Sequence, residues 1–296
     1  MRPSLTDHVV VITGAGKGLG RAFALDLAAH GARVVVNNRN RVVDDRGLGP
    51  ADHVVREILA MGGDAVADYC AVEDPGTAER LVQTALDRWG RLDALVTNAA
   101  ISRPQMIHKT TAENLTDVLA VNVTGTILPA AAASRVMREA GYGRIVLVAS
   151  TAGLHGEPTV SAYAASKGAV IAFGRTAAVE GARRGVYTNT VLPYATTQMT
   201  EANIDPRHAA KMQAEAVAPL VRALLDPRST INGEVIVAAA GALRTADAVE
   251  GATVTLPASA DPSDLADLLA TSRNGARHTF PEAQAAFQHF AAEATA

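Results

Sequence analysis

The sequence contains a single cysteine, Cys70, among 296 residues. One cysteine can form neither an internal disulfide nor a multi-cysteine metal cluster, which excludes a disulfide-stapled scaffold and favours the reducing cytoplasm. Neither sign of charge is in large excess, because the chain has 27 Lys and Arg and 30 Asp and Glu. This balance offers no basic surface to nucleic acid or to an anionic membrane, so we expect a small-molecule partner.

Long hydrophobic runs are absent as well. The best apolar stretches, Ile127–Ala133 and Val235–Leu243, are interrupted by Pro129 and Gly241 and fall short of the roughly 18 residues of a membrane-spanning helix. The 8 histidines are scattered without the spacing of paired ligands, which predicts no metal site. We therefore expect a chain that neither spans a membrane nor holds a metal.

Short runs rich in Val and Ile alternate with longer amphipathic stretches along most of the chain. The runs that predict strands are Val9–Ile12, Val34–Val36, Ala65–Ala67, Ala94–Val96, Ile145–Val148, Thr190–Leu192 and Val235–Val237. The stretches that predict helices are Leu19–His30, Ala51–Met61, Thr77–Trp89, Leu115–Val121, Ala130–Ala140 and Ala162–Arg183. Fully apolar strands separated by helices predict the α/β class with a doubly wound parallel sheet.

A glycine-rich loop follows the first predicted strand and opens the first predicted helix. Gly14, Gly18 and Gly20 would let the backbone turn tightly and approach a phosphate, while the helix N-terminus offers free N–H groups. A glycine-rich turn without a ligand is the alternative, but the position between strand and helix favours a dinucleotide cradle.

Four polar residues stand at spacings that suggest one catalytic site. Tyr163 and Lys167 are four residues apart in a predicted helix, so both project from one helix face. Ser150 follows a predicted strand, where ligands bind in an open α/β sheet. With Asn122 upstream, these residues resemble the catalytic tetrad of the short-chain dehydrogenase/reductase family.

The resemblance covers roughly residues 5–257. It rests also on the T-G-x-x-x-G-x-G spacing of the glycine loop and on Asn98-Ala99-Ala100, which is similar to the family's N-A-G motif. The resemblance implies a Rossmann fold and an enzyme that interconverts a ketone and a secondary alcohol with NAD(P).

The chemistry explains the residue types. Hydride transfer to a ketone builds negative charge on its oxygen, which needs a proton donor and a hydrogen-bond donor. Tyr163 can give the proton, Ser150 can hold the oxygen, and the ammonium of Lys167 is expected to lower the pKa of the phenol. The resemblance further implies that Lys167 binds the nicotinamide ribose and that Asn122 supports a water-linked proton relay.

The residues after the second strand bear on the choice of dinucleotide. An acidic residue that grips the ribose of NAD is common there, but this chain has Asn38 followed by Arg39. Arg39 and Lys17 could pair with a 2′-phosphate, so NADP(H) is favoured over NAD(H), with solvated surface charges as the alternative. The expected cofactor contacts are Gly14, Lys17, Gly18, Leu19, Gly20, Asn38, Arg39, Val72, Asn98, Ala99, Tyr163, Lys167 and Pro193.

One branch of the family is especially similar. The long segment 37–50, the segments 216–221 and 241–244, and the tail beyond Pro257 resemble the (3R)-hydroxyacyl-CoA dehydrogenase domains of peroxisomal multifunctional enzymes type 2. The resemblance implies a 3-ketoacyl or (3R)-hydroxyacyl thioester as substrate. A polyketide-type or other cyclic ketone stays open, as does a non-catalytic NADP-binding sensor or structural subunit.

The organisation predicted from these signals is one domain, residues 1–257, followed by a helical extension, 258–296. The loop 193–210 is expected to cover the substrate. Candidate pocket residues are His155, Pro158, Tyr194 and Met199. Members of the family usually pair through helices, so the resemblance also implies a homodimer or homotetramer.

Overall fold

The computed structural model describes residues 5–39, 43–198 and 206–294. The chain forms two compact units, Met1–Thr245 and Ala246–Ala296. The sequence predicts this boundary at residue 257, whereas in the structure the first unit ends at Thr245. The last strand of the sheet ends at Thr245, and Glu250 pairs with His278 of the second unit. Segment 246–257 therefore belongs with the C-terminal helices.

The first unit is built on one eight-stranded sheet with the order β3-β2-β1-β4-β5-β6-β7-β8. The strands are β1 (Val9–Ile12), β2 (Arg33–Asn37), β3 (Asp64–Asp68), β4 (Ala94–Thr97), β5 (Gly143–Val148), β6 (Val186–Pro193), β7 (Val235–Ala239) and β8 (Ala242–Thr245). Strands β1 to β7 pair in parallel, as predicted, and β8 pairs antiparallel with β7. The sequence did not reveal β8 because all four of its residues are exposed, which leaves no buried apolar run.

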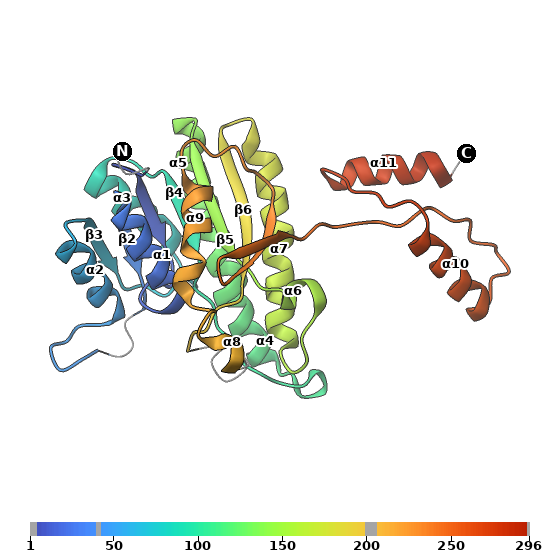
Figure 1. The fold of residues 1–296 in the computed structure, drawn as a ribbon, viewed down its shortest axis with the longest axis horizontal. Coiled ribbons are helices and arrows are strands. Elements are labelled where there is room, and N and C mark those ends of the chain that lie inside the picture. Colours follow the sequence, from blue (N-terminus) through green and yellow to red (C-terminus); the bar gives the residue numbers. More distant parts are fainter. Residues whose placement is uncertain (1–4, 40–42, 199–205, 295–296) are drawn as a thin grey trace. The chain divides into compact units, whose positions relative to one another are not determined.

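Helices cover both faces of this sheet (Figure 1). They are α1 (Gly18–Ala29), α2 (Pro50–Ala60), α3 (Thr77–Trp89), α4 (Ala112–Leu119), α5 (Gly125–Ala140), α6 (Ala152–His155), α7 (Ser161–Ala182), α8 (Pro206–Ala209) and α9 (Ala218–Leu225). Helix α1 packs beside α2 and α9, whereas α3, α5 and α7 pack together. This arrangement confirms the predicted doubly wound α/β architecture.

The core lies between the sheet and these two helical layers. Val10 and Ile12 of β1 are fully buried against Phe23 and Leu27 of α1, and Leu224 of α9 completes the same cluster. Each such side chain stabilises the fold by about 1.5–3 kcal/mol. The core therefore fixes the position of α1, whose N-terminus carries the glycine loop.

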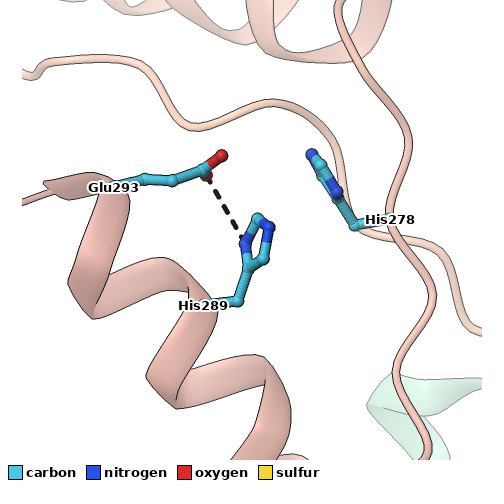
Figure 2. Close-up of side chains that lie close together, drawn as sticks. All are labelled: His278, His289 and Glu293. Atoms are coloured by element: carbon cyan, nitrogen blue, oxygen red, sulfur yellow. Dashed lines mark ion pairs between the residues drawn. The ribbon is translucent and has the colours of Figure 1, made fainter.

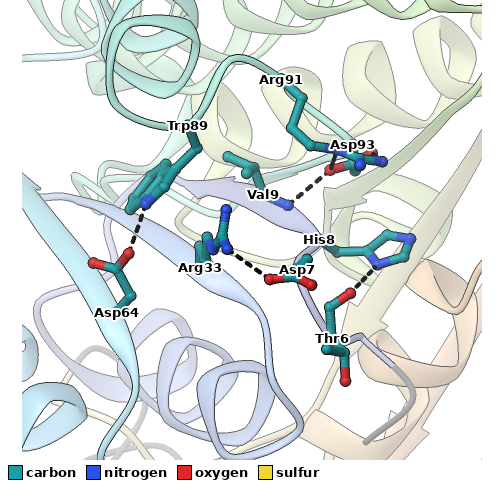
Figure 3. Close-up of polar contacts among 9 residues, drawn as sticks. All are labelled: Thr6, Asp7, His8, Val9, Arg33, Asp64, Trp89, Arg91 and Asp93. Atoms are coloured by element: carbon teal, nitrogen blue, oxygen red, sulfur yellow. Dashed lines mark hydrogen bonds and ion pairs between the residues drawn. The ribbon is translucent and has the colours of Figure 1, made fainter.

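Polar side chains fasten the amino-terminal edge of the sheet (Figure 3). The carboxylate of Asp93 accepts a hydrogen bond of 2.8 Å from the backbone N–H of Val9 and pairs with Arg91 at 2.6 Å. The indole N–H of Trp89 donates to Asp64 at 2.7 Å. These bonds hold the ends of neighbouring strands together at the edge opposite to the one where parallel sheets bind ligands.

A continuous helical stretch over Ala112–Ala140 joins α4, a π-helical turn η2 (Ala120–Thr124) and α5. The sequence predicts two separate helices in this stretch. It also predicts that no segment of the chain can cross a membrane. Among the described residues, this stretch is long and apolar enough to do so by length and composition alone. However, 44% of its most apolar window is buried, and α5 packs against α3, as a core helix does.

The second unit contains α10 (Pro262–Asn274) and α11 (Ala283–Ala294). Helix α10 begins at Pro262 because the carboxylate of Asp261 accepts hydrogen bonds from the backbone N–H groups of Ser263 and Asp264, and Pro262 suits the first helical position. None of the described residues of this unit is buried.

Candidate active site

A large pocket opens at the carboxyl edge of the sheet, where β1 has β2 on one side and β4 on the other. This is the switch point at which doubly wound sheets bind ligands. Its volume of about 1530 Å³ exceeds the roughly 300–1,000 Å³ of a pocket for a single small ligand. All predicted cofactor positions except Gly20 line it: Gly14, Lys17, Gly18, Leu19, Asn38, Arg39, Val72, Asn98, Ala99, Tyr163, Lys167 and Pro193.

The glycine loop has the shape that a pyrophosphate needs. Gly14 and Gly18 adopt positive φ values of +63° and +52°, which disfavour other residues. A Cβ at Gly14 would lie 2.8 Å from the Cα of Ala99, and a Cβ at Gly20 would lie 2.3 Å from the carbonyl oxygen of Gly14. Gly20 therefore allows α1 to pack closely, while the loop leaves the N-terminus of α1 open to a phosphate.

A small hydrogen-bond network supports this loop from β4. The hydroxyl of Thr13 accepts bonds of 3.0 and 3.2 Å from the backbone N–H groups of Asn98 and Ala99. The side-chain amide of Asn98 donates to the carbonyl of Gly14 at 3.1 Å. Thr13 was not among the predicted site residues, although its place directly before the first glycine of the motif is a signal that could have identified it.

The predicted catalytic side chains Ser150, Tyr163 and Lys167 meet at the end of β5. Ser150 follows that strand, and its side chain hydrogen-bonds the hydroxyl of Tyr163 on α7. One turn along α7, the Nζ atom of Lys167 donates to the carbonyl of Val148 at 2.9 Å. It lies 5.7 Å from the centre of the Tyr163 ring. The sheet and α7 thus bring together three residues that the sequence only suggested were neighbours.

Asn122 lies beneath the pocket and does not line it among the described residues. Its side chain accepts from the N–H of Ile101 at 2.8 Å and donates to the carbonyl of Ile101 at 3.0 Å. It also donates to the hydroxyl of Ser166 at 2.9 Å, and Ser166 donates to the carbonyl of Tyr163. The π-helical turn places Asn122 where it connects the pocket wall to α7, a common use of such turns. Sequence reasoning missed Ser166, although it directly precedes Lys167.

Burial controls the proton affinities of the catalytic pair. It raises the pKa of Tyr163, and the hydrogen bond with Ser150 only partly opposes this. Burial also lowers the pKa of Lys167 from 10.5 to about 8. The net shift of the pKa of Tyr163 is thus upward, opposite in direction to the shift expected from Lys167. Burial disfavours the charged phenolate, which is why the pKa of Tyr163 moves upward.

The opposite end of the pocket carries an ion pair that is only partly exposed. The Nη1 atom of Arg39 lies 2.9 Å from Oε1 of Glu73. The other oxygen of Glu73 is buried and has no hydrogen-bond partner among the described residues. Asn38 uses its side chain locally, donating to the carbonyl of Arg39 at 3.2 Å. Sequence reasoning missed Glu73, because only the packing of the segment after β3 beside β2 brings it to Arg39.

Of the four predicted substrate-pocket residues, two line the pocket, one faces solvent and one lies outside the described residues. Pro158 and Tyr194 line the pocket, and Thr197, Gln198 and Met212 join them there. His155 does not: it ends α6 with its side chain exposed, because the short helix carries it away from the described pocket wall. Met199 lies outside the described residues.

Residues 8–208 match the family model described as short chain dehydrogenase. The chain belongs to the short-chain dehydrogenase/reductase family. It is an oxidoreductase of this family that acts on a ketone or alcohol group with NAD(P)(H). The glycine loop and the pocket described above have the shape that such a dinucleotide requires.

Several curated proteins are similar to this member of the family. A short-chain type dehydrogenase/reductase of Mycobacterium tuberculosis is 40% identical over 81% of the chain and 84% of the relative. The peroxisomal multifunctional enzyme A of Dictyostelium discoideum is 37% identical over 81% of the chain, which spans only 54% of that enzyme. A 3-oxoacyl-[acyl-carrier-protein] reductase of Synechocystis is 40% identical over 69% of the chain and 81% of the relative.

Solved structures of family members agree with this fold. A short chain dehydrogenase from Mycobacterium avium has a TM-score of 0.81 at 36% identity, covering 94% of this chain and 98% of its own. Full-length peroxisomal multifunctional enzyme type 2 from Drosophila melanogaster has a TM-score of 0.80 at 30% identity, covering 97% of this chain and 49% of its own. Levodione reductase has a TM-score of 0.71 at 32% identity, with coverage of 80% and 98%.

Proposed function

We propose that this protein reduces a 3-ketoacyl thioester to its hydroxyacyl form with NADPH. The observation that carries the reaction class is that Ser150, Tyr163 and Lys167 line the same pocket as the glycine loop. A dinucleotide held at that loop and a ketone held at these side chains would share one cavity. The pocket is large enough for both.

The residues have distinct roles in this proposal. Ser150 holds the ketone oxygen through its hydroxyl, and Tyr163 gives that oxygen a proton as charge develops on it. The raised pKa of Tyr163 keeps its hydroxyl protonated at neutral pH, which suits a proton donor in the direction of reduction. The reduced nicotinamide, when bound, supplies the hydride.

Lys167 and Asn122 support these two side chains. The Nζ of Lys167 is fixed by the carbonyl of Val148 beside Tyr163, where it can bind a ribose hydroxyl and return a proton to the phenol. Asn122 holds the backbone of Ile101 on the pocket wall. In the proposed reaction, Asn122 also supports a water-linked proton relay.

The preference for NADPH is supported by the charges at the far end of the pocket. Lys17 and Arg39 line that end together with Glu73, so cationic side chains outnumber the acid there, whereas the nearby Arg21 is paired with Glu57. A 2′-phosphate carries more negative charge than one carboxylate and can compete with Glu73 for Arg39 through bidentate hydrogen bonds. No acidic side chain occupies position 38, where it would repel that phosphate.

The thioester substrate is supported by two independent similarities. The Synechocystis relative is a 3-oxoacyl-[acyl-carrier-protein] reductase, and the other close matches include peroxisomal multifunctional enzymes. Reduction of a cyclic ketone is a second candidate, favoured by the similarity to levodione reductase. A non-catalytic NADP-binding role is less well supported, because all four tetrad residues are retained.

We further infer that the protein assembles as a homodimer or homotetramer. Leu115, Leu128 and Val179 are large apolar residues of α4, α5 and α7 that stay 39%, 49% and 46% exposed. Pairing through these helices would remove them from water. Light scattering should give a mass of two or four chains, and a single-chain mass at all working concentrations would contradict the assembly.

The activity is tested by following nicotinamide absorbance with NADPH or NADH and a panel of ketones. The panel runs from a short 3-ketoacyl thioester to bulky cyclic ketones. We expect thioester-dependent loss of NADPH that falls by about 10²–10⁴-fold in Tyr163→Phe, which removes only the hydroxyl. Turnover with cyclic ketones alone would favour the second candidate. Tight NADPH binding without any turnover would favour the non-catalytic role.

A further inference from the structure

The C-terminal unit, residues 246–294 as described, lacks a buried hydrophobic core, which is the usual source of stability. None of its described residues is buried, and the chain's one cysteine lies elsewhere, at position 70. Units of this size seldom build a sufficient hydrophobic core and commonly depend on a disulfide, a metal or association. The folded shape of α10 and α11 therefore calls for some other cross-link.

Three potential metal ligands converge in this unit (Figure 2). His289 and Glu293 lie one turn apart on α11, and His278 faces them from the segment that pairs with Glu250. Their ligand atoms all lie within 4.8 Å of one another. The Nδ1 of His289 is 3.6 Å from Oε2 of Glu293, and the two imidazole rings are 4.6 Å apart between centres.

The surroundings of this cluster suit a bound cation. The three side chains line a cleft of about 220 Å³ within the unit, together with Phe280 and Thr253. The hydroxyl of Thr253 donates to Oε2 of Glu293 at 2.6 Å and holds the pKa of this carboxyl below its usual value. A hydrogen bond of this kind orients the carboxylate, as the hydrogen-bond partners of metal-ligating side chains commonly do.

We propose that His278, His289 and Glu293 bind one Zn²⁺ ion, which cross-links α11 to the segment before it. Zinc ligands at 2.0–2.2 Å in tetrahedral geometry stand about 3.4 Å apart, so side-chain rotations are sufficient to close the site. Two imidazoles and one carboxylate favour zinc over magnesium or calcium, which prefer oxygen ligands alone.

This site departs from the prediction that the chain holds no metal. The i, i+4 pair on α11 places two ligands on one helix face, but nothing in the sequence showed that His278 would lie beside them. The turn that brings the segment around His278 back to Glu250 decides this, and it is a feature of the folded chain.

Zinc titration of the full-length chain tests the proposal. After treatment with a chelator, isothermal titration with Zn²⁺ should show one site per chain. His278→Ala, His289→Ala and Glu293→Gln should each weaken binding by about tenfold or more, since each removes one of three ligands. Two control variants, Gln288→Ala on the same helix and His108→Ala in the first unit, should bind as the unchanged chain does.

Limited trypsin digestion tests the cross-linking role separately from enzymatic activity. Arg273 in the last turn of α10 and Arg277 directly before His278 are both exposed. Zinc should slow cleavage there several-fold in the unchanged chain and have no effect in His289→Ala. Absence of zinc binding, or equal affinity in all variants, would overturn the proposal. Protection that rises with protein concentration and ignores zinc would also overturn it and indicate association with a second copy instead.

Discussion

The two ends of the large pocket hold their charged groups in opposite ways. At the catalytic end, Lys167 is 2% exposed and donates a hydrogen bond to the backbone of Val148. At the other end, Arg39 and Glu73 form an ion pair whose side chains are 31% and 21% exposed. In the proposed function, the chemistry would therefore depend on a fixed and desolvated group, whereas the choice of cofactor would depend on a partly exposed ion pair.

The physical basis of this contrast is solvent access. A buried amine has lost its hydration, which lowers the pKa of Lys167 to about 8. Partly exposed charges keep much of their hydration and are screened by salt, so a pair such as Arg39 and Glu73 is weak. Substitutions at the Lys167 end should therefore have larger effects than those at the Arg39 end.

The largest effect is expected from Lys167→Met. Loss of the amine beside Tyr163 should lower kcat by about 10²–10⁴-fold, the range of general acid–base contributions. The variant should keep the fold, because methionine fills a similar volume without a charge. Steady-state kinetics measures the loss, and a kcat within tenfold of the unchanged enzyme would contradict the role.

The same variant tests the buried charge through the pH dependence of stability. Between about pH 8 and pH 10.5 the unfolded chain keeps a proton on Lys167 that the folded chain has released. Stability of the unchanged protein should therefore rise with pH across this window relative to Lys167→Met, by up to about 3 kcal/mol. Chemical denaturation of both proteins at several pH values checks this, and parallel curves would show that Lys167 is not desolvated.

A smaller effect is expected from Arg39→Gln at the other end. Removing the cation should weaken NADPH binding by about 10–100-fold, since hydrogen bonds to charged groups contribute roughly 1.5–3 kcal/mol. NADH binding should change little, because it has no 2′-phosphate. Titration with both cofactors measures the two affinities. Lys109→Gln, an exposed change outside the described pocket wall, is the control, and equal losses for NADPH and NADH would contradict the assignment.

The smallest effect is expected from Glu73→Gln. This change removes the acid that competes for Arg39, so NADPH should bind up to about fivefold more tightly, as the weak strength of an exposed ion pair implies. The same cofactor titration measures it. Weaker NADPH binding would instead show that Glu73 is needed to position Arg39.

Parts of the site were predictable because their signals are local. The glycine loop follows a four-residue apolar strand, and Tyr163 and Lys167 share a helix face by spacing alone. Glu73 was missed because it pairs with a residue 34 positions away in the chain. His155 was a candidate pocket residue, but the short helix α6 directs it to solvent.

The sequence by itself determined the order of β1 to β7 and of the long helices between them, the glycine loop and the candidate catalytic side chains, because backbone conformation and chemical type are local properties. Only the tertiary structure decided the proton affinities of Tyr163 and Lys167, the pairing of Arg39 with Glu73 and the convergence of His278 with α11. These depend on burial and on contacts between distant segments, since solvent access and distance in space follow from packing and not from position in the chain.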